Sequence, residues 1–250
     1  MWKKYPLKYK PEIIVSFNED KHIYYVGDKK VESVTGICGR GLPKPNLVNW
    51  LVATPLNEVK RLINERLDNN DPLDRAGLER IFKTAKEKTN KIKEDAGLVG
   101  TVVHGLIEDF LKGKEIPKQS DKAVVNCWNL FLDWWNKGEY TVVELEKKIY
   151  SKKYDYVGTL DLVVKDKKGN LVLIDIKTSN FISFDYFLQL NGYKYAYEEE
   201  TGSKVSKSFI VKLSKKDAEI EIKEIPLNKK LLNAFIGAKY VMEQMQSVEI

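Results

Sequence analysis

The stretch YVGTLDLVVKDKKGNLVLIDIKTS, Tyr156–Ser179, decides how the chain is read. Two apolar runs flank the short polar segment Lys167–Gly169. A three-residue loop with glycine in its third position is typical of a hairpin built on a type I turn and a glycine bulge. Such a turn fixes the register of the two strands, and counting back from it sets Asp161 directly opposite Asp175.

Two opposed carboxylates need a physical reason, because like charges facing each other across a sheet destabilise it. Asp175 also interrupts Leu171–Ile176, an apolar run typical of a buried strand. Buried carboxylates are rare unless they are paired or bound to a metal. Lys177 lies two residues further on, and therefore on the same face of the strand. The pattern predicts a divalent-metal site with a lysine partner, whereas the alternative is a solvated pair on an ordinary edge strand.

Composition favours a soluble, intracellular protein. The chain has 250 residues, 43% of them hydrophobic, enough for one large domain or a core with an accessory lobe. We expect no membrane segment and no signal peptide, and a cytoplasmic location in a bacterial or phage-infected host, since no apolar run approaches membrane-spanning length. Cys38 and Cys127 stand far apart, which excludes a four-cysteine metal site within one chain.

Charge is compatible with nucleic acid but does not establish it. The net charge is +6, and only five of the 42 basic residues are arginine. Lysine contacts to phosphate carry little sequence information, so we expect backbone-directed rather than base-specific binding.

The order of predicted elements indicates an α/β fold with a mixed central sheet flanked by helices. We expect an N-terminal accessory lobe of short strands and helices over residues 1–95 and a core over 96–250, joined in one compact unit. The expected elements are short strands within 12–35, a loop over 39–45, helices over 46–53, 55–68, 74–95, 98–112 and 119–137, strands over 140–150, 155–165 and 170–177, a helix over 184–200, strands over 205–213 and 218–225, and a helix over 227–246.

Acidic and histidine side chains precede the hairpin. His104 and Glu108 are four residues apart at the border of an apolar helix face. Alone, this spacing indicates an ordinary half-exposed pair, and His-x-x-x-Glu does not fit a zincin. Glu144 and Glu146 precede the hairpin on the adjacent strand, where solvent-facing positions are favoured over additional metal ligands.

Gln189 and Tyr193 are four residues apart in the helix that follows the hairpin, within a tyrosine stripe at helical spacing. Such a stripe is usually core. Alternatively, Gln189 would hydrogen-bond a phosphate or a metal-bound water, and Tyr193 would brace it or stack on a base.

Taken together, these motifs resemble the RecB-like branch of the PD-(D/E)XK nucleases. The resemblance rests on four motifs in order, Gly-Thr-x-x-His-x-x-x-Glu, Gly-x-x-Asp, Asp-x-Lys-Thr and Gln-x-x-x-Tyr, which cover roughly residues 97–197. The residues that match them are Gly100, Thr101, His104, Glu108, Gly158, Asp161, Asp175, Lys177, Thr178, Gln189 and Tyr193.

The resemblance implies a restriction-endonuclease-like core and Mg²⁺, or Mn²⁺ in its place, as cofactor. Asp161, Asp175 and the backbone carbonyl of Ile176 would ligate the metal. His104 would line the metal site, and Glu108 would ligate directly or through water.

The same resemblance implies phosphodiester hydrolysis without a covalent intermediate. Lys177 would orient or activate the attacking water, and its pKa can fall in such a site. Gln189 and Tyr193 would position the DNA strand.

The resemblance also narrows the class of nuclease. The chain lacks the cysteines that clamp an iron–sulfur cluster and has no Walker A motif. We therefore expect a stand-alone phage or mitochondrial-type exonuclease in DNA recombination, repair or replication. Its partners would be DNA, single-stranded or at a duplex end, and a recombination or replication protein. The alternatives are a flap or branch endonuclease and a non-catalytic DNA-binding subunit.

Overall fold

The computed structural model describes residues 1–248. These residues form two compact units, one made of Met1–Leu42 and the chain from Val103 onward, the other of Pro43–Val102. The predicted functional division between residues 1–95 and 96–250 stays a prediction. Within residues 1–248, the helices lack the combination of length and apolar character needed to cross a membrane.

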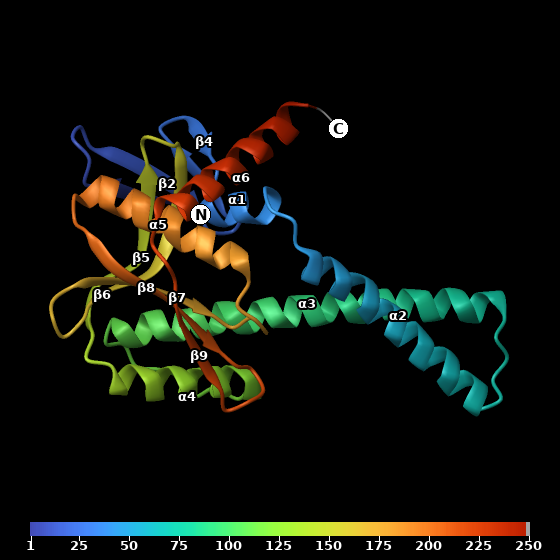
Figure 1. The fold of residues 1–250 in the computed structure, drawn as a ribbon. Helices are drawn as coiled ribbons and strands as arrows, with labels where there is room; N and C mark the ends of the chain where they lie inside the picture. The colour runs from blue at the N-terminus through green and yellow to red at the C-terminus, as the bar shows by residue number, and fades with distance from the viewer. Residues whose placement is uncertain (249–250) are drawn as a thin grey trace. The chain divides into compact units, whose positions relative to one another are not determined.

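The first unit opens with an antiparallel sheet whose strands follow one another in chain order (Figure 1). Its strands are β1 (Trp2–Leu7), β2 (Ile13–Asn18), β3 (Ile23–Val26) and β4 (Lys29–Val31). Gly27 turns the chain between β3 and β4 at φ +58°. The buried face of this sheet packs against Tyr150 and Val157 of the larger sheet. The two sheets therefore share a hydrophobic cluster within the same unit.

The second sheet of this unit carries the predicted hairpin. In the described part of the chain its strands are β5 (Thr141–Ser151), β6 (Tyr156–Lys165), β7 (Leu171–Lys177), β8 (Val205–Leu213) and β9 (Ile220–Glu224), in that spatial order. β7 and β8 are parallel and the other neighbours antiparallel, so the sheet is mixed as predicted. Asp166 donates its backbone N–H to the Asn170 carbonyl at 3.0 Å, which confirms the predicted hairpin turn.

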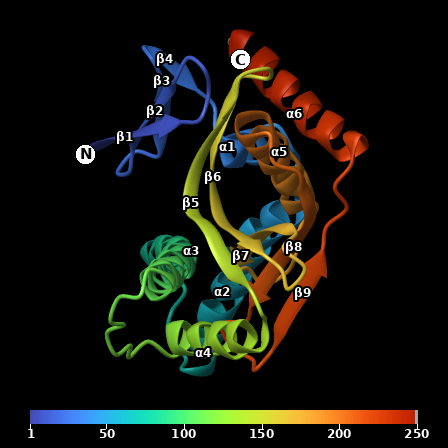
Figure 2. The same ribbon diagram turned by 90° about the vertical axis from the view of Figure 1, so that its left-hand side faces the viewer.

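Helices flank the mixed sheet on both faces (Figure 2). They are α1 (Val34–Arg40), α4 (Lys122–Lys137), α5 (Phe184–Thr201) and α6 (Lys229–Ser247). α1, α5 and α6 share one core with the inward side chains of the sheet, such as Leu173 and Ile210, while α4 packs against β8. The predicted α/β fold class is confirmed.

Helix α1 was not predicted. Gly36 and Gly39 make this stretch resemble a loop, but the Ser33 hydroxyl accepts the backbone N–H of Gly36 and caps the first turn. Val34 and Ile37 are fully buried, so packing rather than helix propensity holds this helix in place.

The second unit contains two helices whose predicted interruptions were wrong. α2 (Pro45–Asp68) runs through Pro55, where two helices were expected, and α3 (Arg75–Leu111) runs through Gly97 and Gly100 for 37 residues. Its last turns, from Val103, belong to the first unit. A glycine costs a helix about 1 kcal/mol and a proline about 3 kcal/mol, which the long flanking segments outweigh here.

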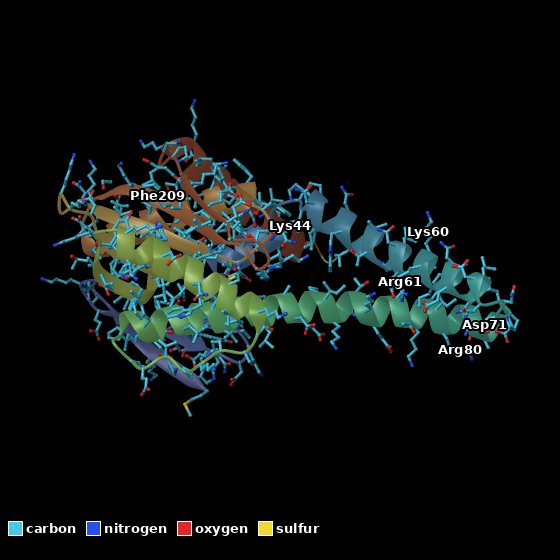
Figure 3. All side chains as sticks on the ribbon, turned by 90° about the horizontal axis from the view of Figure 1, so that it is seen from below. Lys44, Lys60, Arg61, Asp71, Arg80 and Phe209 are labelled. Carbon is cyan, nitrogen blue, oxygen red and sulfur yellow. The ribbon has the colours of Figure 1, made fainter. Side chains whose placement is uncertain are left out.

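An ion-pair network links the two helices of the second unit. Glu58 of α2 is 8% exposed and accepts hydrogen bonds from Arg61 at 2.7 Å and from Lys88 of α3 at 2.7 Å. Figure 3 labels Arg61 on α2 and Arg80 on α3. The hydrogen bonds from Arg61 and then Lys88 lower the pKa of Glu58 to about 2. Within α2, all of whose residues are described, Glu58 alone is buried.

We predict that Glu58→Gln lowers the melting temperature at pH 7 and flattens its pH dependence. A carboxyl whose folded-state pKa is depressed stabilises the fold fully above its ordinary value of 4.5, and this contribution is lost as the pH falls toward 2. Circular dichroism melts from pH 7 to pH 3 would measure it. Glu79→Gln, which removes an exposed pair with Arg75, is the control and should have little effect. Equal melting curves for the Glu58 and Glu79 variants would contradict the prediction.

Candidate functional site

The candidate site lies where the pairing of β6 with β7 stops. The ladder between these strands ends at the pair Leu162 and Ile174. The next opposed pair in this register is Asp161 and Asp175, as the sequence predicts. Instead of a further backbone bond, the Asp161 carboxylate accepts the backbone N–H of Ile176 at 2.9 Å. The side chain thus fixes its own orientation against the neighbouring strand.

Asp175 is buried without the hydrogen-bond donors that a carboxylate needs. Its residue is 2% exposed, and neither oxygen has a hydrogen-bond partner of good geometry among residues 1–248. A positive charge lies beside it, because Lys177 Nζ is 2.6 Å from Oδ2. The pKa of Asp175 is raised to about 6, chiefly by burial. The charge of Lys177 acts to lower this pKa, and the charge of Asp161 acts to raise it.

The pKa of Lys177 is raised, although the resemblance to the nuclease family allowed for a lowered pKa. Burial acts to lower this pKa, but the negative charges of Asp175 and then Asp161 outweigh it. Its Nζ also lies 4.9 Å from the centre of the Tyr186 ring, a further favourable contact for a cation. The ammonium is therefore fully protonated at neutral pH.

A second group of potential metal-binding atoms includes Asp161 together with His104 and Glu146. One ligand atom each from His104, Glu146 and Asp161 lies within 4.8 Å of the others, and His104 Nδ1 is 3.8 Å from Asp161 Oδ2. His104 comes from α3 and Glu146 from β5. All three line one small pocket with the backbone segment at Ile176. Carboxylate and imidazole ligands at this separation suit a divalent cation.

Glu146 is a residue of the site whose predicted position was wrong. It was expected to face solvent, but it lies opposite Asp161, because Leu145 pairs with Leu162 and Lys147 with Leu160. Its backbone adopts φ +47°, and Lys148 Nζ donates to its carbonyl at 3.3 Å. Burial, and then the charge of Asp161, raise the pKa of Glu146 to about 8.

An irregularity explains why the sequence did not reveal Glu146. The register of β5 against β6 shifts between Val142 and Glu144, which changes the face that each later residue occupies. Glu144, in contrast, forms an ion pair with Lys8 at 3.1 Å. Strand alternation read from the sequence cannot locate such a shift.

Glu108 lies at the edge of the site. It lines the same pocket as His104, while its carboxylate pairs with Lys112 one turn further along α3. Its role as a metal ligand, direct or through water, stays a prediction.

Gln189 and Tyr193 form a buried layer behind the carboxylates. Gln189 Nε2 donates to Tyr193 Oη at 2.8 Å, and the two residues are 5% and 2% exposed. Burial, followed by the charges of Asp175 and Asp161, raises the pKa of Tyr193 far above its usual range. So buried a ring offers no face to a base, and the bracing role fits better than stacking. A Cβ added at Gly158 would lie 2.6 Å from Tyr193 Cε1, so this glycine makes room for the ring.

The burial of Asp175 fits a bound cation. An ionised carboxylate with unsatisfied oxygens is costly in a core, and a divalent cation between Asp161 and Asp175 would satisfy it. His104 and Glu146 could complete the ligand set. The carbonyl of Ile176, a predicted ligand, belongs to a residue that lines the same pocket.

Comparison with known proteins gives a family match over most of the chain. The sequence model described as "PD-(D/E)XK nuclease superfamily" matches residues 75–248. Among solved structures, that of SSO0001 is similar at 15% identity and TM-score 0.34, over 77% of this chain and 74% of that one. A Eubacterium rectale protein described as a "putative exonuclease" is similar at 13% identity and TM-score 0.40, over 60% of this chain and 65% of that one. No curated protein matches the sequence.

We predict that Gly158→Ala destabilises the protein by about 1–3 kcal/mol, because the added methyl group overpacks the Tyr193 ring. Urea denaturation would measure the loss. Gly105→Ala is the matched control, since a Cβ there meets nothing within 4 Å and alanine favours the helix. The packing argument fails if both substitutions change stability equally.

We predict that Mn²⁺ stabilises the wild type by about 1–3 kcal/mol at saturation and barely stabilises Asp175→Asn. Without metal, Asp175→Asn should melt at the wild-type temperature or above, since the relief of repulsion with Asp161 offsets the loss of the ion pair with Lys177. Thermal-shift titration measures both effects.

The same titration tests the corrected position of Glu146. Glu146→Gln should reduce the Mn²⁺ shift, and Glu144→Gln, on the same strand, should leave it intact. Equal shifts in the wild type and Asp175→Asn would remove the metal from this site.

Proposed function

Since the chain belongs to the PD-(D/E)XK nuclease superfamily, we propose that it is a metal-dependent deoxyribonuclease, more narrowly an exonuclease of the RecB-like branch that acts in DNA recombination, repair or replication. The observation that carries this proposal is the buried Asp175 carboxylate, 2% exposed, opposite Asp161 and 2.6 Å from the Lys177 ammonium. Two carboxylates and a lysine on one sheet face could hold a divalent cation and stabilise the negative charge that grows on a phosphate during hydrolysis.

Asp161 and Asp175 would hold the cation, with His104 and Glu146 beside them. A bound divalent cation would act as a Lewis acid toward the phosphate and make a coordinated water more acidic. The oxygen-rich ligand set favours Mg²⁺, and the imidazole of His104 is compatible with Mn²⁺ as a substitute.

Lys177 would act as a fixed positive charge. Its raised pKa keeps the ammonium protonated, so it can donate to a phosphoryl oxygen as negative charge grows there. This favours a stabilising and water-orienting role over that of a general base. The neighbouring Tyr186 ring restricts its movement.

Gln189 and Tyr193 would support the site from behind. Their mutual hydrogen bond and burial keep water away from the inner side of Asp175. They are positioning residues in this account, because the buried hydroxyl and amide reach the DNA only through the carboxylates that they pack behind.

Two other functions are weaker alternatives. A flap or branch endonuclease would use the same site, and only the substrate distinguishes it. A non-catalytic DNA-binding subunit would not need to keep the buried pair of Asp175 and Lys177, which is costly to maintain.

We predict that Lys177→Ala lowers the cleavage rate by roughly 10²–10³-fold, the typical cost of removing one preorganised charge or donor. Cleavage of end-labelled DNA with Mg²⁺ would measure it. Lys207→Ala, an exposed lysine of β8 that lies 4.0 Å from Glu224, is the control. A Lys177→Ala protein that cuts at nearly the wild-type rate would show that the assignment is wrong.

The substrate form separates the proposed function from its alternatives. An exonuclease should degrade linear DNA in Mg²⁺, leave closed circles intact and require metal throughout. Cutting of circles or of branched junctions alone would favour an endonuclease. Binding without cleavage of any substrate would favour the non-catalytic subunit.

A further inference from the structure

Exposed aromatic rings lie immediately after the strand that carries the site. Phe181, between β7 and α5, and Phe184, the first residue of α5, are 48% and 61% exposed. Phe184 stacks on Phe187 with ring centres 5.7 Å apart and planes 30° apart, and Lys223 Nζ lies 5.2 Å from the Phe187 ring. We call Phe181, Phe184 and Phe187 the aromatic segment. Exposed apolar rings grouped in this way are typical of an interaction surface.

The aromatic segment is joined directly to the proposed catalytic lysine. Tyr186, which precedes Phe187 in α5, places its ring 4.9 Å from Lys177 Nζ. Only three residues separate Lys177 from Phe181 in the chain. A strand whose phosphate reaches Lys177 would therefore carry its neighbouring nucleotides past these rings.

A basic cavity opens beside the same segment. It has a volume of about 260 Å³ and is lined by Lys212, Lys215 and Lys216 together with Ser179 and Asn180. It lies at the carboxyl ends of the parallel strands β7 and β8, where Lys177 pairs with Lys212. This edge of a parallel pair is where open α/β sheets commonly bind ligands.

The charges and hydrogen bonds of the cavity suit one or two phosphates rather than a long duplex backbone. Three lysines line the cavity beside two carboxylates, Asp217 and Glu219, and Glu221 pairs with Lys212, so a phosphate would bind to individual ammonium groups rather than to a broad positive surface. Lys212 Nζ also lies 2.9 Å from Glu221 and 3.4 Å from the Asn180 carbonyl, which ties the cavity to the aromatic segment.

The loop that carries Lys215 and Lys216 is held in place from the other side of the sheet. Asn126 of α4 donates its side-chain amide to the carbonyls of Ser214 and Asp217, both at 2.9 Å. A braced loop loses little freedom on binding, which favours preformed recognition.

We propose that the aromatic segment and the basic cavity together bind unpaired DNA next to the scissile phosphate, with bases stacked on Phe184 and a backbone phosphate in the cavity. Single-strand-binding proteins combine a positive groove with aromatic stacking platforms in this way. In a duplex the base faces are covered by their neighbours, so an exposed ring selects a strand whose bases are free. This inference rests on the proposed function and specifies its substrate as single-stranded DNA or a frayed end.

The test measures, by fluorescence anisotropy, how tightly the full chain binds a labelled single-stranded oligonucleotide. The buffer contains Ca²⁺, with which turnover is expected to be low. Stacking contributes about 1–3 kcal/mol per base, so Phe184→Ala should weaken binding roughly 5- to 150-fold. Phe184→Trp should keep the affinity, whereas Phe184→Leu should lose it, because stacking needs a flat ring rather than apolar area alone.

Two controls make the result specific. Tyr240→Ala removes another exposed ring, 62% exposed on α6, and should leave binding unchanged. Lys216→Ala should weaken binding and reduce its dependence on salt by about one phosphate contact. Melting temperatures of all variants should match the wild type, since the altered side chains are exposed.

The proposal is overturned if Phe184→Ala binds the single strand as the wild type does, or if it loses blunt-duplex affinity equally. Cleavage by the wild type in Mg²⁺ is measured separately. A wild type that cleaves DNA while Phe184→Ala binds normally would refute this surface alone, and a wild type that cleaves no DNA would refute the proposed function.

Discussion

A carboxylate placed in a core without donors governs the arrangement of this protein. Asp175 is 2% exposed, and Lys177 Nζ lies 2.6 Å from its Oδ2. The solvation that an ionised group loses on burial must be replaced, or the group takes up a proton, and its pKa of about 6 reflects that competition. A divalent cation would resolve the conflict, and the site would then trade stability of the metal-free protein for affinity.

The strands around this carboxylate depart from regular β-structure. The β6–β7 ladder ends one pair early, so that the Asp161 side chain can accept the N–H of Ile176. Glu146 sits at φ +47° within β5, a conformation unfavourable for a residue with a side chain, and Lys148 donates to its carbonyl. Gly158 removes a side chain so that Tyr193 can close the back of the site. Backbone strain and lost pairing thus concentrate where these acidic side chains converge.

The sequence was sufficient for those features that short-range rules determine. The loop that ends at Gly169 was enough to predict the hairpin and the register of its two strands. The strands from β5 to β9 begin and end close to their predicted limits. Three kinds of feature were out of reach. The bulge before Glu144 reassigned the faces of β5 and so hid Glu146. Burial held α1 in place despite its glycines, and long flanking segments carried α2 through Pro55. The cavity beside Lys212 depends on the parallel pairing of β7 with β8, which no local pattern encodes.

The central claim is that the buried carboxylates exist to hold a cation, and anomalous diffraction from crystals grown with Mn²⁺ tests it most directly. We expect an anomalous peak within ligand distance of the carboxylates of Asp161 and Asp175, with His104 or Glu146 also close to it. Crystals saturated with Mn²⁺ that show no peak within ligand distance of Asp161, and an Asp175 still paired only with Lys177, would contradict it.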